Sequence, residues 1–190
     1  MNVHKSRSTL LTTLLALLFS SVFLVSPVRA AETIAKDHIE AKMYDIDDVG
    51  LVIVWNSKGA KTISQCHWVS GNHGSGSAKV APHLVESENY VIFVLYNKVY
   101  DGGIFFRGGK WSYNFSLEKN GAAVWTKANH VRDNSRGIKY WKILRITVSS
   151  DGKAIVSEDI DIAVRKLLES KRIDVEEKLN GSMSVARPFR

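Results

Sequence analysis

The stretch KWSYNFSLEKNG, residues 110–121, decides the fold. Polar residues alternate in it with the large apolar side chains of Trp111, Tyr113, Phe115 and Leu117. A period of two predicts a β-strand with one face in the core and the other in water. The strand ends at Asn120-Gly121, a pair that favours a two-residue hairpin turn because both central residues of a type I′ turn need a positive φ.

Further strands are predicted on both sides of this hairpin. Short apolar runs occupy residues 51–55 and 62–69, and residues 89–100 carry apolar side chains on both faces, which is typical of a central, covered strand. A second hairpin spans residues 140–156, and a two-residue turn at Asp151-Gly152 would place Val148 opposite Ile155. Residues 31–48 fit either a helix or a strand.

A helix follows the last hairpin. From Ser157 onward the apolar residues recur with a helical period, which predicts a helix at about residues 158–170 capped by Ser157 or Asp159. These elements predict a mainly β fold, an antiparallel β-sandwich or open barrel with a C-terminal α-helix packed on or beside the sheet. One globular domain covers residues 31–180, and residues 181–190, which have no period, form a frayed basic tail.

The first thirty residues have the build of a cleavable secretory signal peptide. Lys5 and Arg7 precede an apolar run, and the small-residue site Val28-Arg29-Ala30 follows it. The run contains Thr and Ser residues and is shorter than the ~20 apolar residues that a transmembrane helix needs. We therefore expect cleavage before Ala31, a mature protein without a transmembrane segment, and a secreted or periplasmic location.

Charge and cysteine content narrow the function classes. The chain has a formal net charge of +7, and loss of the three cations of the signal lowers it to +4, which is too little to indicate nucleic acid as a partner. Cys66 is the only cysteine, so a disulfide within the chain is excluded. We expect Cys66 to be a buried thiol.

A thiol-dependent reaction would need Cys66 beside a base. The order Cys66, His130 and Asn129 or Asp133 is one that thiol hydrolases use, but many chains contain three such residues by chance. An enzyme is therefore disfavoured, and we predict no catalytic residue.

The histidines near Cys66 raise the question of a metal site. Cys66 and His67 are neighbours on a predicted strand and point to opposite faces, so they do not readily share one ion. Their spacing from His73 and His83 matches no zinc pattern. We predict neither a metal site nor a cofactor, and we interpret the Gly/Ser-rich residues 71–77 as a flexible connection.

Residues 125–145 mix basic and aromatic side chains, a composition that suits anionic partners. A strand with a wet basic face and buried aromatic rings would show the same pattern. The predicted binding residues are Trp125, Lys127, Arg132, Arg136 and Lys139, with Asn114 and Ser116 on the neighbouring strand. The partners considered are an anionic lipid, a glycan and an envelope protein.

Trp125 carries most of this binding hypothesis. A strict two-residue turn at Asn120-Gly121 places Trp125 opposite Ser116 on the polar face, where a large aromatic ring usually has a partner. A bulge or a three-residue loop would instead flip the second strand and bury Trp125.

The function predicted first is an exported, non-enzymatic β-sandwich binding protein that turns this basic and aromatic face toward an envelope, glycan or protein partner. The alternative is a membrane-active protein, lipid-binding or pore-forming and toxin-like, whose Trp and Tyr side chains settle at the lipid interface. A thiol- or metal-dependent hydrolase ranks third. No family resemblance accompanies these hypotheses.

Overall fold

The computed structural model describes residues 34–67, 73–98, 110–133 and 135–184. Two helices lie in these residues, a short 3-10 helix η1 (Ala81–His83) and the α-helix α2 (Ile162–Ser184). The strands of the described residues are β1 (Ile39–Ile46), β2 (Val49–Asn56), β3 (Gly59–His67), β4 (Gly74–Lys79), β5 (Ser87–Asn97), β6 (Lys110–Lys119), β7 (Ala122–Arg132), β8 (Gly137–Val148) and β9 (Ala154–Ser157).

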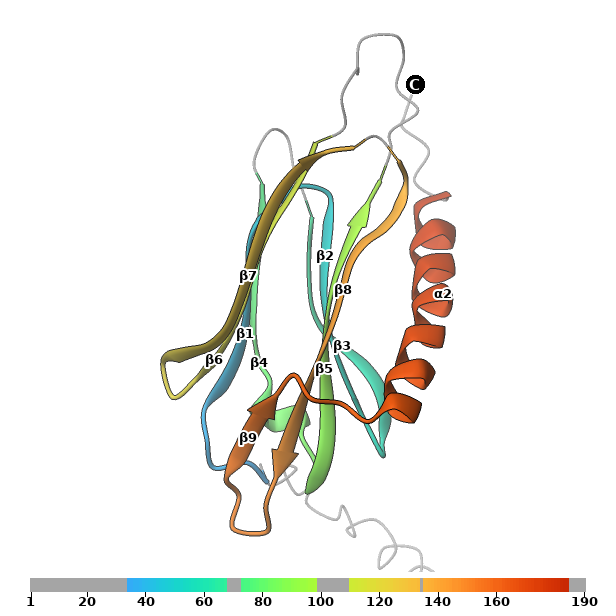
Figure 1. The fold of residues 1–190 in the computed structure, drawn as a ribbon. Helices are drawn as coiled ribbons and strands as arrows, with labels where there is room; N and C mark the ends of the chain where they lie inside the picture. The colour runs from blue at the N-terminus through green and yellow to red at the C-terminus, as the bar shows by residue number, and fades with distance from the viewer. Residues whose placement is uncertain (1–33, 68–72, 99–109, 134, 185–190) are drawn as a thin grey trace, which may run out of the picture. The chain divides into compact units, whose positions relative to one another are not determined.

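The strands form two antiparallel sheets that pack as a sandwich (Figure 1). Sheet A has the order β4-β1-β6-β7, and sheet B has the order β3-β2-β5-β8-β9. Each sheet has two edge strands, so neither closes into a barrel. The predicted mainly β fold with a C-terminal helix is confirmed, and of its two forms the sandwich is the one present.

The core between the sheets is built from the apolar rows that the alternation predicted. Tyr113, Phe115 and Leu117 of β6 are buried there, together with Val91, Phe93 and Leu95 of β5. The rings of Phe93 and Phe115 lie 5.3 Å apart between centroids, a distance typical of favourable aromatic pairs. The region 31–48, which the sequence left open, contains strand β1, and its alternate residues Ile39, Ala41 and Met43 complete this core.

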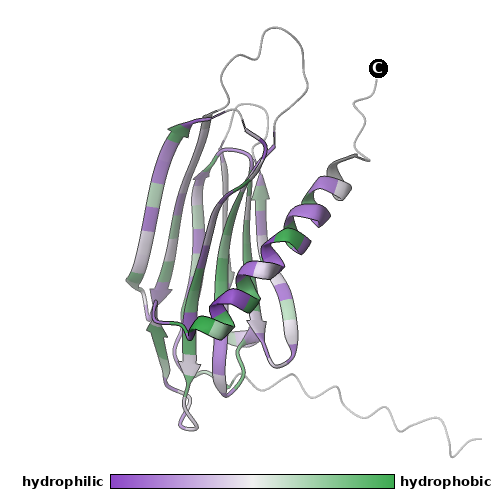
Figure 2. Cartoon of the chain, turned by 45° about the vertical axis from the view of Figure 1, so that its right-hand side comes forward, coloured by the Kyte–Doolittle hydropathy of each residue, from purple (hydrophilic) through white to green (hydrophobic). Residues whose placement is uncertain are grey.

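Strand β5 is covered on both faces, as predicted. Its second face, with Ile92 and Val94, belongs to a separate apolar cluster that includes Leu168 and Leu179 of α2. Helix α2 therefore packs on the outer face of sheet B, and Figure 2 shows it crossing that face obliquely. Burial of its apolar stripe against the sheet is what stabilises a helix of this kind.

The helix differs from the predicted range of about 158–170. It begins later because Asp161, rather than Ser157 or Asp159, accepts hydrogen bonds from the first free backbone N–H groups, those of Ala163 at 2.8 Å and Val164 at 3.3 Å. It continues to Ser184 because the apolar stripe that packs on sheet B extends to Leu179. Residues 181–184, predicted to fray, are helical.

Strand β4 replaces part of the flexible connection predicted at residues 71–77. It pairs with β1 at one edge of sheet A, where β3 of sheet B also approaches. A Cβ atom at Gly74 would lie 2.8 Å from the carbonyl oxygen of His67, and one at Gly76 would lie 3.2 Å from Ser64 Oγ. Glycine is needed at position 74 because the backbone of His67 leaves no room for a side chain, whereas at Gly76 the nearest atoms belong to side chains.

The β6–β7 hairpin has the predicted turn but not the predicted register. Asn120 and Gly121 adopt positive φ values of 52° and 81°, as a type I′ turn requires. A register shift follows between Leu117 and Glu118, and it leaves Leu117, rather than Ser116, opposite Trp125. The placement of Trp125 on the polar face is therefore wrong, because one bulged residue moves every later side chain of β7 to the other face.

The β8–β9 hairpin also differs in register, because Val148 faces Ala154 and not Ile155. The turn closes with a hydrogen bond from Gly152 N to Ser149 O at 2.8 Å, and Gly152 has a φ of 84°. A glycine in the left-handed region after such a turn adds one residue to the loop. Ile155 consequently lies in solvent.

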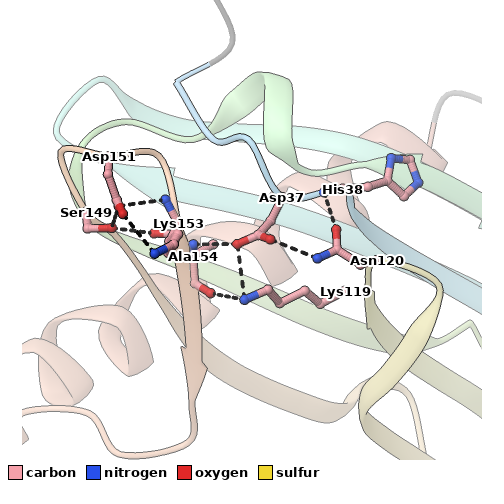
Figure 3. A network of polar contacts seen from close by, with 8 residues as sticks. All are labelled: Asp37, His38, Lys119, Asn120, Ser149, Asp151, Lys153 and Ala154. Atoms are coloured by element: carbon pink, nitrogen blue, oxygen red, sulfur yellow. Dashed lines mark hydrogen bonds and ion pairs between the residues drawn. The ribbon is translucent and has the colours of Figure 1, made fainter.

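A polar network ties the segment before β1 to both hairpins (Figure 3). The carboxylate of Asp37 accepts hydrogen bonds from Ala154 N at 2.7 Å and from Asn120 Nδ2 at 2.8 Å, and Lys119 Nζ lies 3.1 Å away. Lys119 also donates to the carbonyl oxygen of Ala154 at 2.6 Å. These contacts hold one end of the sandwich together, and we call them the Asp37 clamp.

The predicted signal segment, residues 1–30, and the last residues of the predicted tail, 185–190, lie outside the described residues. Of the helices that the structure describes, none combines the length and the apolar composition needed to cross a membrane.

Candidate ligand-binding groove

The structure separates the residues of the predicted basic and aromatic ribbon. Trp125 is half-buried and packs on the sandwich core. Lys127 shares its face of β7 with Trp125 but is exposed, because β7 is an edge strand. Asn114 and Ser116 lie on the opposite, outer face of sheet A, where Asn114 is exposed and Ser116 is buried.

Several cations of the ribbon are already paired within the protein. Lys139 Nζ lies 2.8 Å from Asp133 Oδ2, and that contact, with hydrogen bonds from Ser135, holds the pKa of Asp133 well below its usual range. Arg136 Nε donates to the hydroxyl of Tyr96 at 2.8 Å. Arg132 is exposed at the end of β7. Binding of a partner by the ribbon stays a prediction.

The residues of the predicted thiol and metal chemistry are also apart. Cys66 is buried at the inner face of β3 beside Met43 Sδ at 3.9 Å, whereas His130 is exposed on β7, beyond β1 and β6 in sheet A. His130 therefore lies two strand spacings, about 10 Å, from the strand β1 that Cys66 contacts. This distance is too long for a hydrogen bond between the thiol and the imidazole. Within the described residues, no three His, Cys, Asp or Glu side chains are grouped as a metal site would need.

The structure forms a groove that the sequence did not indicate. It lies between α2 and the outer face of sheet B, has a volume of about 390 Å³, and is open to solvent. Its floor is apolar and comes from Leu51, Ile53, Ile92, Val175 and Leu179. We call this feature the α2 groove.

Two tryptophans form part of the wall of the α2 groove. Trp55 of β2 and Trp141 of β8 both line it, and each is half-buried against the cluster under α2. The Nε1 atom of Trp141 is buried and has no hydrogen-bond partner among the described residues. The accessible part of the Trp141 side chain is therefore carbon.

Polar groups are confined to the rim of the groove. On one side, edge strand β3 contributes the exposed residues Thr62 and Gln65. On the other side, α2 contributes Lys171 and Lys178, which are seven residues apart and so lie on the same side of the helix, two turns from each other. Among the described residues that line the groove there is no carboxylate.

Contacts on the far side of α2 fix the width of the groove. Arg172 donates to the carbonyl oxygen of Ile138 at 2.7 Å, and the hydroxyl of Tyr96 donates to the side-chain oxygen of Asn180. Both partners belong to sheet B, so the helix is bound to the sheet near its middle and near its C-terminal end. The groove is thus preformed between two fixed elements.

The sequence held only an indirect signal for this groove. Its lining residues come from four strands and one helix and are spread along the sequence from Leu51 to Leu179. No local sequence motif therefore identifies the groove. Strand β2 nevertheless has apolar residues on both faces although its neighbour β3 is mostly exposed, which indicates that something covers its outer face.

The chain was compared with protein-family models, curated proteins and solved structures, and none of them matches it.

Proposed function

We propose that this chain is an exported, non-enzymatic binding protein and that its ligand lies in the α2 groove. The observation that carries the proposal is the groove itself, a concavity of about 390 Å³ with an apolar floor and a few polar groups at its rim. Its size and composition fall in the range of small-molecule sites, which are mostly apolar and largely preformed.

The first experiment asks whether the groove takes an apolar ligand. A neutral solvatochromic dye, Nile red, should bind the folded protein with a blue-shifted, saturable emission. The variant Ala60→Trp should abolish this binding, because Ala60 is exposed on β3 and lines the groove, so a large ring there fills the space without entering the core.

The matched control for this variant is Ala128→Trp. Ala128 is also an exposed alanine on an edge strand, but it lies on β7 of the other sheet. Nile red should bind Ala128→Trp as it binds the wild type, and both variants should keep the wild-type melting temperature. Saturable dye binding that Ala60→Trp leaves unchanged, or no binding at all, would contradict the proposal.

Export is part of the same proposal and has its own test. The basic start, the apolar run and the site Val28-Arg29-Ala30 support a cleavable signal. Protein recovered from outside the cytoplasm of an expressing cell should have an intact mass that begins at Ala31. A mass that retains residues 1–30 would refute processing without affecting the groove.

A further inference from the structure

The charges at the rim of the α2 groove restrict its ligand. Lys171 and Lys178 are the ionisable residues that line it, and both carry positive charge at neutral pH. Among the described residues, no carboxylate lines the groove itself. An anion at the rim is therefore favoured over a neutral group and a cation is disfavoured, and the nearby apolar surface weakens solvent screening.

The two lysines are not equivalent. Lys171 Nζ lies 3.1 Å from Asp174 on the same helix, whereas no ion pair of Lys178 occurs among the described residues. Lys178 is thus the stronger site for an incoming negative charge, and Lys171 contributes at longer range.

The apolar floor of the groove restricts which chemical groups the remainder of the ligand can carry. Leu51, Ile53 and Ile92 offer no hydrogen-bonding side chain, and the accessible part of Trp141 is carbon. A second charged group would lose its water there without replacement, which is unfavourable. The part of the ligand on the floor must therefore be hydrocarbon.

We propose that the α2 groove binds an anionic amphiphile, a carboxylate whose hydrocarbon part lies on the floor and whose carboxylate group meets Lys178. This inference rests on the proposed function and adds the chemical class of the ligand. The carboxylate stays at the rim in water, and the hydrocarbon part replaces solvent over Leu51 and Ile53.

The test compares three probes that share one chain length, namely dodecanoate, dodecanol and dodecyltrimethylammonium. The two ionic probes are titrated below their micelle concentrations and dodecanol below its solubility limit, and binding is measured by displacement of Nile red. Dodecanoate should bind about two- to fivefold more tightly than dodecanol, as expected for one partly screened ion pair, and the cation should bind most weakly. The advantage of dodecanoate should shrink as salt is added.

The variant Lys178→Gln measures how much the charge of Lys178 contributes to binding. It should weaken dodecanoate binding about two- to fivefold and leave dodecanol unchanged, because the side chain keeps most of its length and loses its charge. The control is Lys166→Gln, an exposed lysine of the same helix that does not line the groove. That variant should bind all three probes as the wild type does.

The outcomes separate the two proposals. Equal binding of dodecanoate and dodecanol, or no effect of Lys178→Gln, would overturn the anionic class, and the groove would remain an apolar site if Ala60→Trp still blocked Nile red. Dodecanoate binding to Ala60→Trp is measured by isothermal titration calorimetry, because this variant has no bound Nile red to displace. Dodecanoate binding that persists there would place the anion elsewhere and would also overturn the inference. Loss of all Nile red binding in the wild type would overturn the proposed function and this inference with it.

Discussion

The ring of Trp125 lies 4.9 Å, centroid to centroid, from the ring of Phe93 in the facing sheet, with an angle of 31° between their planes. Trp125 belongs to the edge strand β7 of sheet A, and Phe93 is fully buried on β5 at the centre of sheet B. The contact thus joins the two sheets through aromatic rings. It gives Trp125 a structural role, whereas the sequence had favoured a role in binding.

The first prediction follows from this contact. Trp125→Ala should lower the free energy of unfolding by roughly 3 kcal/mol, the low end for a large aromatic residue because the ring is half-buried. Urea unfolding followed by circular dichroism measures this change. Val124→Ala is the control, since Val124 is 46% exposed and should change stability little. A Trp125→Ala variant as stable as the wild type would contradict the core placement.

The second prediction concerns the Asp37 clamp. Hydrogen bonds from Ala154 and Asn120, together with Lys119, lower the pKa of Asp37 from 3.8 to about 2. The folded state therefore favours the charged carboxylate over the neutral acid. The contribution of this carboxylate to the free energy of unfolding is complete above pH 4 and is lost as the pH falls toward 2. Unfolding curves from pH 2 to 6 should show this decline in the wild type.

The variant Asp37→Asn tests whether the charge of Asp37 causes this pH dependence of stability. The variant should be less stable than the wild type at pH 6, and the difference should narrow toward pH 2, because about half of the wild-type carboxyl groups are then protonated in the folded state. Glu169→Gln removes an exposed carboxylate of α2 and should leave the curves unchanged. A difference between wild type and Asp37→Asn that stays constant with pH would exclude the charge as its cause.

The third prediction concerns Asp48, in the turn between β1 and β2. Burial, and then the negative charge of Asp47, raise the pKa of Asp48 to about 7, and a backbone hydrogen bond from Lys98 opposes the rise. The folded state therefore favours the neutral acid. Stability should fall by roughly 1–3 kcal/mol as the pH rises from 4 to 7, allowing for the partial exposure of the group.

Asp48→Asn should remove most of this pH dependence and should be the more stable form above pH 7. Asparagine suits the position because Asp48 has a φ of 91°, and Asn tolerates positive φ better than most residues. A carboxyl titration by NMR gives the direct measurement. An Asp48 resonance that titrates near pH 4 would refute the prediction.

The fourth prediction concerns Cys66. Burial raises the pKa of its thiol to about 11, so little thiolate exists at pH 8 in the folded protein. A disulfide reagent should label the native protein far more slowly than the protein in urea. Rapid labelling without denaturant would show that the thiol is accessible and would revive the thiol-dependent alternative.

The sequence predicted the strands and their faces better than their partners. The apolar side chains on both faces of residues 89–100 correctly indicated a central strand, since a strand that is buried on both faces is apolar at consecutive positions of its sequence. The predicted pairs Ser116–Trp125 and Val148–Ile155 were each displaced by one residue. Bulges depend on how a strand fits the opposite sheet, and residue types at the turn do not reveal them.

The groove that we propose as the binding site was less predictable than the fold. The ribbon from Trp125 onward was prominent because its residues are adjacent in the sequence, yet strands β7 and β8 lie in different sheets and divide it. The α2 groove depends instead on where α2 crosses sheet B, and Lys178 lies beyond the end of the predicted helix. Tertiary packing creates the site, so only the structure reveals it.

The Asp37 clamp also bears on when the chain can fold. Asp37 precedes the first strand, and its partner Ala154 follows 117 residues later. Strand β1 lies inside sheet A between β4 and β6, so its second neighbour is complete only when residue 119 has been made. Contacts over such separations form slowly, and we expect the growing chain to stay largely unfolded during synthesis. Because the segment before β1 meets its last partner only in the β8–β9 hairpin, the full chain could still be threaded through a membrane before it folds, as the proposed export requires.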